Sequence, residues 1–180
     1  MTEVASFAAW LGAAVIVLSD GRRGLALGLA LITVAFTLLA WMGGERIAAV
    51  ALLFGGAVAV VQRLRTGLDV WRVMPPGSTP RLVLAIGGGL LALWIATSVM
   101  TGAGAPLRFA ALGVVGLMGS RVLMADIKPA AVLTSLAALA LSVAVASGMA
   151  DTGLGPSPYI AAAVIALGIS LIKVQDTNGG

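Results

Sequence analysis

Seven long apolar runs divide this chain, and short stretches rich in arginine, aspartate, glycine and proline separate them. About 20 consecutive apolar residues are enough for a helix to cross the hydrocarbon core of a bilayer. The runs lack the ten-residue alternation of a membrane β-barrel, and an open sheet cannot span lipid. The pattern therefore predicts an all-α membrane bundle with helices over residues 4–19, 25–42, 47–61, 82–100, 107–120, 129–150 and 158–174.

The composition agrees with this prediction. Hydrophobic residues make up 60% of the 180-residue chain and charged residues only 10%, whereas about a quarter of the residues in a soluble domain are charged. Seven crossings of roughly 20 residues use nearly the whole length. We therefore expect residues 1–180 to form a single integral membrane domain, without a separate soluble one.

The arginines and lysines predict how the helices are oriented. The loops at 19–24, 62–81 and 121–128, with the tail after Lys173, alternate with the remaining loops. They hold nine of the eleven basic residues, and only Arg46 and Arg108 lie in the opposite set. Cytoplasmic loops carry the excess of Lys and Arg, so the N-terminus is predicted outside and the C-terminus inside a bacterial inner membrane. The net charge of +4 then needs no nucleic-acid partner.

The longest charged stretch, residues 62–81, predicts a basic inner loop with a short interfacial helix. Four apolar positions share one helical face: Val61, Leu64, Leu68 and Trp71. Three charged positions lie close enough to pair and to contact lipid or a partner: Arg65, Asp69 and Arg72. We expect Trp71 at headgroup depth. The alternative is that the third helix simply continues past the membrane.

Glycines recur at spacings that favour close helix packing. Gly24 and Gly28 are four residues apart, and Gly113, Gly116 and Gly119 are three apart. Small residues let helix backbones approach in lipid, where the hydrophobic effect does not drive helices together. Glycines 87–89 lack the Lys-Ser/Thr ending of a phosphate loop, so close contact or a kink is expected there.

Two halves of the chain resemble each other. Residues 7–12 (FAAWLG) open the first helix, and residues 109–113 (FAALG) lie near the start of the fifth. Each is followed by a short helix, a basic turn, a longer helix, a turn with an acid and a third helix. This order predicts a parallel repeat of triplets, 4–61 and 107–174, joined by the basic loop and a connecting helix at 82–100.

The sequence contains no recognisable catalytic site. There is no cysteine or histidine, which excludes thiolate and histidine metal sites and a Ser-His-Asp triad. No ionisable residue lies in the middle of a predicted helix, where proton and ion pathways place them. Arg121, Asp126 and Lys128 are interpreted as solvated loop charges, with docking of a partner subunit as the alternative. We expect no enzyme activity, cofactor or metal.

Two functions fit these features. The first is a scaffold or coupling subunit of a larger membrane complex, with other membrane subunits or further copies of the chain as partners. The alternative is a small transporter or permease for a neutral or apolar substrate, which needs no charge inside the membrane.

The layout resembles the hydrogenase-4 component E family, whose C-terminal part is similar to the NuoK-like subunit of complex I. The resemblance lies in seven helices, Arg22-Arg23 after the first, a basic proline-containing loop after the third, and Ser120-Arg121 after the fifth. NuoK-like subunits carry glutamates within their second and third helices, but the matching segments 130–150 and 160–172 contain no acid. The resemblance therefore implies a respiratory or hydrogenase-type scaffold subunit beside a proton-pumping module, without its own proton relay.

Overall fold

The chain is a bundle of α-helices in a computed structural model that describes residues 1–66, 79–98, 105–123, 129–149 and 156–172. Within these ranges there are seven helices and no strands. The helices are α1 (Thr2–Leu18), α2 (Arg22–Met42), α3 (Arg46–Arg65), α4 (Thr79–Ser98), α5 (Ala105–Val122), α6 (Pro129–Met149) and α7 (Ser157–Leu171). The expected all-α class is confirmed.

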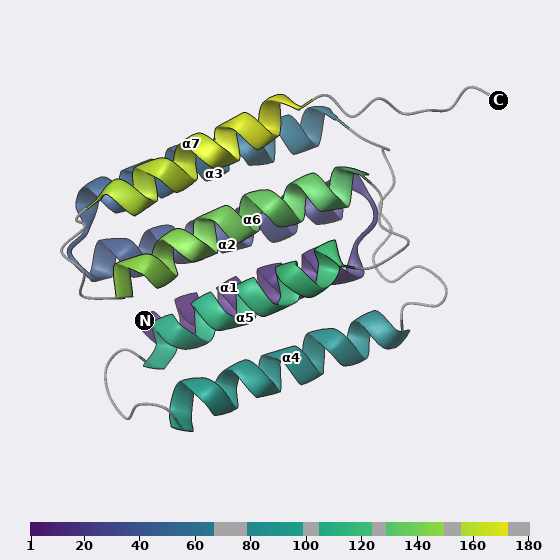
Figure 1. Cartoon of the computed structure of the whole chain (residues 1–180), viewed down its shortest axis with the longest axis horizontal. Helices are drawn as coiled ribbons and strands as arrows, with labels where there is room; N and C mark the ends of the chain where they lie inside the picture. Colours follow the sequence, from purple (N-terminus) through teal and green to yellow (C-terminus); the bar gives the residue numbers. More distant parts are fainter. Residues whose placement is uncertain (67–78, 99–104, 124–128, 150–155, 173–180) are drawn as a thin grey trace.

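The helices lie side by side and alternate in direction, so that Met1 and the end of α7 are at opposite ends of the bundle (Figure 1). Helices α1, α2 and α3 form one layer and α5, α6 and α7 a second. Across the layers α1 packs on α5, α2 on α6 and α3 on α7, and α4 flanks α1 and α5. Each facing pair runs in the same direction.

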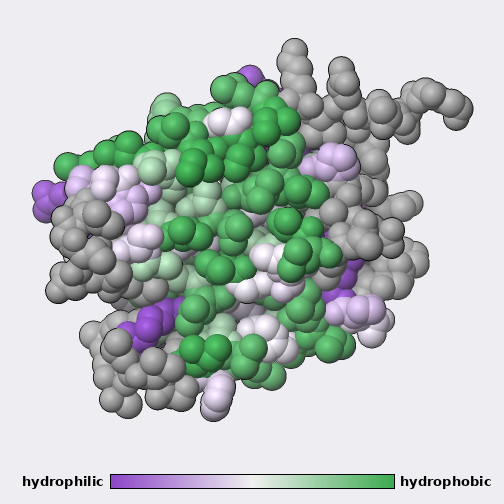
Figure 2. All heavy atoms as spheres, in the orientation of Figure 1, coloured by the Kyte–Doolittle hydropathy of each residue, from purple (hydrophilic) through white to green (hydrophobic). Residues whose placement is uncertain are grey.

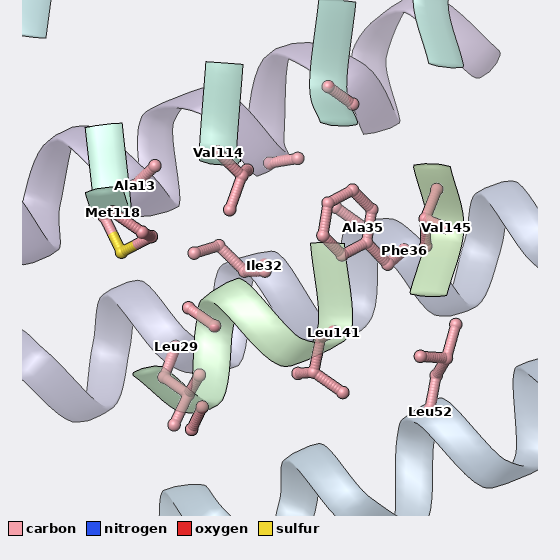
Figure 3. Close-up of a cluster of buried hydrophobic side chains, with 14 of the residues drawn as sticks. Ala13, Leu29, Ile32, Ala35, Phe36, Leu52, Val114, Met118, Leu141 and Val145 are labelled. Carbon is pink, nitrogen blue, oxygen red and sulfur yellow. The ribbon is translucent and has the colours of Figure 1, made fainter. Parts of the chain in front are cut away.

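Small and branched apolar side chains fill the space between the two layers. Figure 3 shows Phe36 and Ile32 of α2 meeting Val114 of α5 and Leu141 of α6, with Leu52 of α3 beside them. In lipid such contacts stabilise the bundle through close packing, and removal of the side chains from water is not the driving force. The outer face in Figure 2 is also largely hydrophobic, which is the surface expected for a helix bundle in lipid.

Glycines bring α1 and α2 close together. A Cβ atom added to Gly28 would lie 2.6 Å from the carbonyl oxygen of Gly12, and one added to Gly12 would lie 2.6 Å from that of Gly28. Gly24 lies equally close to the side chain of Ser19. Close packing of two helices is therefore seen at Gly28, whereas Gly24 packs against Ser19 in the turn between α1 and α2. No side chain larger than hydrogen fits at these positions without movement of the backbone.

The three glycines predicted on α5 behave differently. A Cβ atom on Gly113 would be in ordinary contact, 3.7 Å from Ala92 and from Trp10. Gly116 and Gly119 would meet nothing within 4 Å among the described residues. Among the described residues these two glycines bring no helices together, because no other described helix covers the face of α5 that carries them, and a packing role for them stays a prediction.

The glycines of α4 form contacts as expected at two of three positions. A Cβ atom on Gly89 would collide with the indole of Trp10, and one on Gly88 would lie 3.0 Å from Leu117, but Gly87 is open. The Trp10 Nε1 atom donates a hydrogen bond to the carbonyl of Ala85, at 3.3 Å. Trp10 therefore fixes α4 against α1.

Several helices extend beyond the apolar runs that predicted them. Helix α3 is continuous through Arg65, where Thr66 donates from its hydroxyl to the carbonyl of Gln62. Residues 79–81 already belong to α4, and α5 includes both Arg108 and Arg121. The helical structure therefore continues four residues past the expected end of the third helix at 61 and begins three residues before the expected start of the fourth at 82. Its central part, including the predicted interfacial helix around Trp71, lies outside the described residues.

Three helices in the described ranges are long and apolar enough to cross a membrane. They are α2, α3 and residues 129–147 of α6, with 21, 20 and 19 residues. At 1.5 Å per residue these span about 28–32 Å, close to the thickness of the hydrocarbon core. Helices α1, α4 and α7 contain shorter apolar stretches. The chain thus has the helices of a membrane protein.

Candidate functional site at the arginine-rich end of the bundle

The charged side chains of the described residues gather at the two ends of the bundle. Among the described residues, the end at which α2, α4 and α6 begin carries six arginines and a single acid, and we call it the arginine end. These residues are Arg22, Arg23, Arg63, Arg65, Arg81, Arg121 and Asp20. The opposite end holds two glutamates and two arginines: Glu3, Glu45, Arg46 and Arg108. Every charged residue in a described helix lies in its first or last turn.

Asp20 joins three parts of the chain at the arginine end. It lies in the turn between α1 and α2 and accepts a 2.7 Å hydrogen bond from Nη2 of Arg121, at the end of α5. Arg81, at the start of α4, donates from Nη1 to both carboxylate oxygens at 3.0 and 3.1 Å. The Arg121 side chain is completely buried, whereas those of Asp20 and Arg81 are 15% and 19% exposed.

The two arginines control the ionisation of Asp20. Burial by itself would raise the pKa of its carboxyl, but the hydrogen bonds and positive charges of Arg81 and Arg121 outweigh it and lower the pKa below the ordinary value. Asp20 is therefore a carboxylate at neutral pH. The arrangement can hold α4 and α5 against the α1–α2 turn, but it does not offer a carboxyl that could exchange protons near pH 7.

Arg63 is the second buried arginine at this end and differs from Arg121. Its side chain is only 5% exposed. In the part of the chain that the structure describes, its Nε and Nη1 atoms are shielded from solvent and have no hydrogen-bond acceptor. Arg65, two residues further along α3, is exposed. Buried polar groups in proteins are nearly always hydrogen-bonded, so Arg63 stands out as a position that requires an acceptor.

The structure changes the interpretation of the predicted site residues. Arg121 was expected to be a solvated loop charge, but it is fully buried within α5 and bonded to Asp20. Arg65 is exposed at the end of α3, where contact with lipid or a partner remains a prediction. Asp69, Trp71, Arg72, Asp126 and Lys128 lie outside the described residues. The roles expected for them are therefore not addressed by these contacts.

Sequence reasoning missed Asp20, Arg63 and Arg81 as site residues. Asp20 and Arg81 are separated by 61 positions, and Asp20 and Arg121 by 101. No local spacing connects them. One signal was present: Asp20 is the only acid in the first predicted inner loop, and it lies close to Arg22 and Arg23.

Hydroxyl groups deeper in the bundle mostly bond to their own helix. Thr33 donates to the carbonyl of Leu29 at 2.8 Å, Thr134 to Ala130 at 2.7 Å and Ser142 to Leu139 at 2.9 Å. These three hydroxyls are therefore satisfied by carbonyls of their own helices. The hydroxyls of Thr37 and Ser135 are buried and have no hydrogen-bond partner among the described residues. Over the described ranges, no three Asp, Glu, His or Cys residues come close enough to hold a metal ion.

No known protein guides the interpretation further. The chain matches no family model, no curated protein and no solved structure. The class that the fold defines is thus an all-helical protein with helices suited to a membrane, and the charges at the arginine end are its most distinctive chemistry.

Proposed function

We propose that this chain is an integral membrane protein whose seven helices all cross a bacterial inner membrane, with the arginine end in the cytoplasm. The excess of arginine at one end supports this orientation, because Lys and Arg mark cytoplasmic loops. At the other end Trp41 is 55% and Trp94 66% exposed, and Trp41 lies 5.9 Å from the guanidinium carbon of Arg46. Tryptophan is enriched at membrane interfaces.

We also propose that the two layers are a parallel repeat. The pairing of α1 with α5, α2 with α6 and α3 with α7, each in the same direction, is what two similar triplets stacked on each other would give. Helix α4 then returns the chain across the membrane so that the second triplet starts on the same side as the first.

Within this membrane protein the function we propose is non-catalytic: a scaffold or coupling subunit of a larger membrane complex. The observation that supports it is the confinement of charge to the first and last helical turns of the described residues. Ion and proton pathways place ionisable groups within the membrane. The hydroxyls of Thr33, Thr134 and Ser142 bond to carbonyls of their own helices. This arrangement suits packing against other subunits, as the resemblance to the hydrogenase-4 component E family also implies.

A transporter for an apolar substrate is the second candidate, and one feature favours it. Helices α6 and α7 form an open groove of about 450 Å³ lined by aliphatic side chains such as Leu139, Val143 and Ile165, with Ser147 as a polar group. A groove of this size can hold part of an apolar molecule. It lies along the outward side chains of the second layer.

Purification in a mild detergent separates the two candidates. We expect the native protein to be isolated with other membrane subunits in fixed stoichiometry, and a complex of constant composition after a second purification step would support the scaffold. Isolation as a monomer or homodimer, with protein-dependent movement of an apolar solute across liposomes, would contradict the scaffold and support the transporter.

A further inference from the structure

We propose that Arg63 is the centre of a binding site for the phosphate group of an anionic phospholipid at the arginine end of the bundle. This inference rests on the proposed location in a membrane, because it requires lipid headgroups at that end. It adds a ligand and a residue to the proposed scaffold. The site differs from the Asp20 cluster, whose acceptor is supplied by the chain itself.

The position of Arg63 follows from the packing of α3. Gly55 lies against Ala163 of α7, since an added Cβ would be 2.8 Å from its Cα atom. Both helices run toward the arginine end. Arg63 lies eight residues after Gly55, and Leu171, the last residue of α7, lies eight residues after Ala163, so Arg63 and Leu171 are at the same level. Gly55 and Arg63 are about 12 Å apart along the axis of α3. Arg63 therefore lies where α7 stops covering α3.

Helix α2 gives the depth of Arg63 from the opposite direction. Gly56 contacts Thr33 of α2, and α2 runs antiparallel to α3 (Figure 1). Arg63 lies seven residues after Gly56 in α3, and Ala26 lies seven residues before Thr33 in α2, so Arg63 and Ala26 are at the same depth. Ala26 is about one helical turn inside Arg22, where α2 begins. An arginine one turn inside the end of a membrane helix lies near the boundary between hydrocarbon and headgroups.

The chemistry of the position favours an oxyanion. The guanidinium is always charged, it is nine-tenths buried, and Nε and Nη1 lack an acceptor in the part of the chain described. Burying an arginine without a counter-charge is strongly unfavourable. The only described acid at this end, Asp20, is bonded to Arg81 and Arg121. A phosphate supplies both negative charge and several acceptor oxygens.

The surroundings favour a phosphate that carries acyl chains over a free phosphate. Next to Arg63 on α3, Leu64 is 47% exposed, and at the end of α7 Leu171 and Ile172 are 77% and 55% exposed. These exposed apolar side chains offer a surface for hydrocarbon at the same end of the bundle as Arg63. The cations of Arg22, Arg23 and Arg65 at the same end add a field that attracts anionic lipid.

The test compares Arg63→Gln with Arg65→Gln, which removes the same charge from an exposed position two residues away. Each protein is placed in nanodiscs of phosphatidylcholine with increasing phosphatidylglycerol at constant ionic strength, and its melting temperature is measured. We expect phosphatidylglycerol to raise the melting temperature of the wild type and of Arg65→Gln. In Arg63→Gln the apparent affinity for the anionic lipid should fall about tenfold for each charge-assisted hydrogen bond lost.

Equal lipid responses in the two variants would overturn the proposal, because the general positive charge of this end would then account for binding. If Arg63→Gln does not fold, Arg63→Lys is used in its place. Native mass spectrometry then measures the phosphatidylglycerol that the wild type and Arg63→Lys retain. Phosphatidylglycerol that stays bound to the wild type and binds less to Arg63→Lys supports the site, since lysine keeps the charge but not the guanidinium geometry. Absence of retained phosphatidylglycerol overturns it.

Two further measurements identify other ligands. Inorganic phosphate added in a neutral detergent should give no Arg63-dependent shift, and a shift as large as that of the lipid would reassign the site to free phosphate. Loss of a co-purified subunit in Arg63→Gln with an unchanged lipid response would reassign it to a protein partner. Nanodiscs present the same lipid to both ends, so the result does not depend on the proposed orientation and can fail separately from it.

Discussion

Replacing Asp20 by asparagine tests how the arginine end is held together. The substitution keeps the shape of the side chain but removes the charge that Arg121 meets at 2.7 Å and Arg81 at 3.0 Å. Arg121 is fully buried, so its charge remains in a poorly solvated position. Removal of one partner of a buried ion pair destabilises a protein by about 3–5 kcal/mol. The Asp20 side chain is 15% exposed, so water replaces part of the contact and we expect about 3 kcal/mol.

The assay is thermal unfolding of the purified protein in detergent. For a chain of this length about 3 kcal/mol corresponds to a fall of about 6–12 °C in the melting temperature. Arg81→Gln is the control, because it removes a partner that is 19% exposed and should lower stability by only about 1 kcal/mol. The double variant Asp20→Asn with Arg121→Met should be more stable than Asp20→Asn alone, since no buried charge then remains. Equal melting temperatures for the wild type and Asp20→Asn would refute this reasoning.

Three other predictions concern acid, the α1–α2 contact and the position of α4. The pKa of Asp20 is lowered in the folded protein, so its contribution to stability is present above its ordinary pKa of about 3.9 and lost as the pH falls through the folded-state value. The melting temperature should therefore drop more below about pH 4 in the wild type than in Asp20→Asn, and parallel pH profiles would contradict this. Gly28→Ala should destabilise the protein by about 1–3 kcal/mol through the 2.6 Å approach to Gly12. Gly116→Ala, which meets nothing within 4 Å, should stabilise it by up to about 1 kcal/mol; chemical denaturation of both variants checks the difference, and equal effects would count against the packing. Gly89→Val should displace Trp10 and loosen α4, so limited proteolysis should cut the variant between α3 and α4 faster than the wild type, and an unchanged rate would show that Trp10 does not hold α4.

The sequence predicted the number and order of the helices well, because unbroken apolar runs leave few other structures for the backbone in lipid. The ends were predicted less well. Arg63 and Arg65 were assigned to the basic loop and its interfacial helix, and Arg121 to a loop, because they are charged, yet α3 and α5 continue through them. Arginine is a good helix former and its long stem can stay among apolar groups. Hydropathy therefore marks where the membrane core ends and does not mark where the helix ends.

The candidate site was only partly accessible to sequence reasoning. The concentration of arginine in alternate loops located the end of the bundle that carries it. The partner of Arg121 could not be found, because Asp20 lies 101 residues away and meets it only when α1 packs on α5. Likewise, the α5 glycines have the spacing of a packing motif, but spacing does not tell which face another helix will cover. Gly113 faces α4 and α1, whereas Gly116 is exposed.

The most direct test of the membrane topology uses the absence of natural cysteines. Leu123→Cys, at an 86% exposed position at the arginine end, and Gly43→Cys, at the exposed α2–α3 turn of the opposite end, change no charge. Both variants are treated in intact cells with a thiol reagent that does not cross membranes. We expect Gly43→Cys to be labelled at once and Leu123→Cys only after the membrane is opened. Labelling of Leu123→Cys in intact cells, with Gly43→Cys protected, would contradict the account.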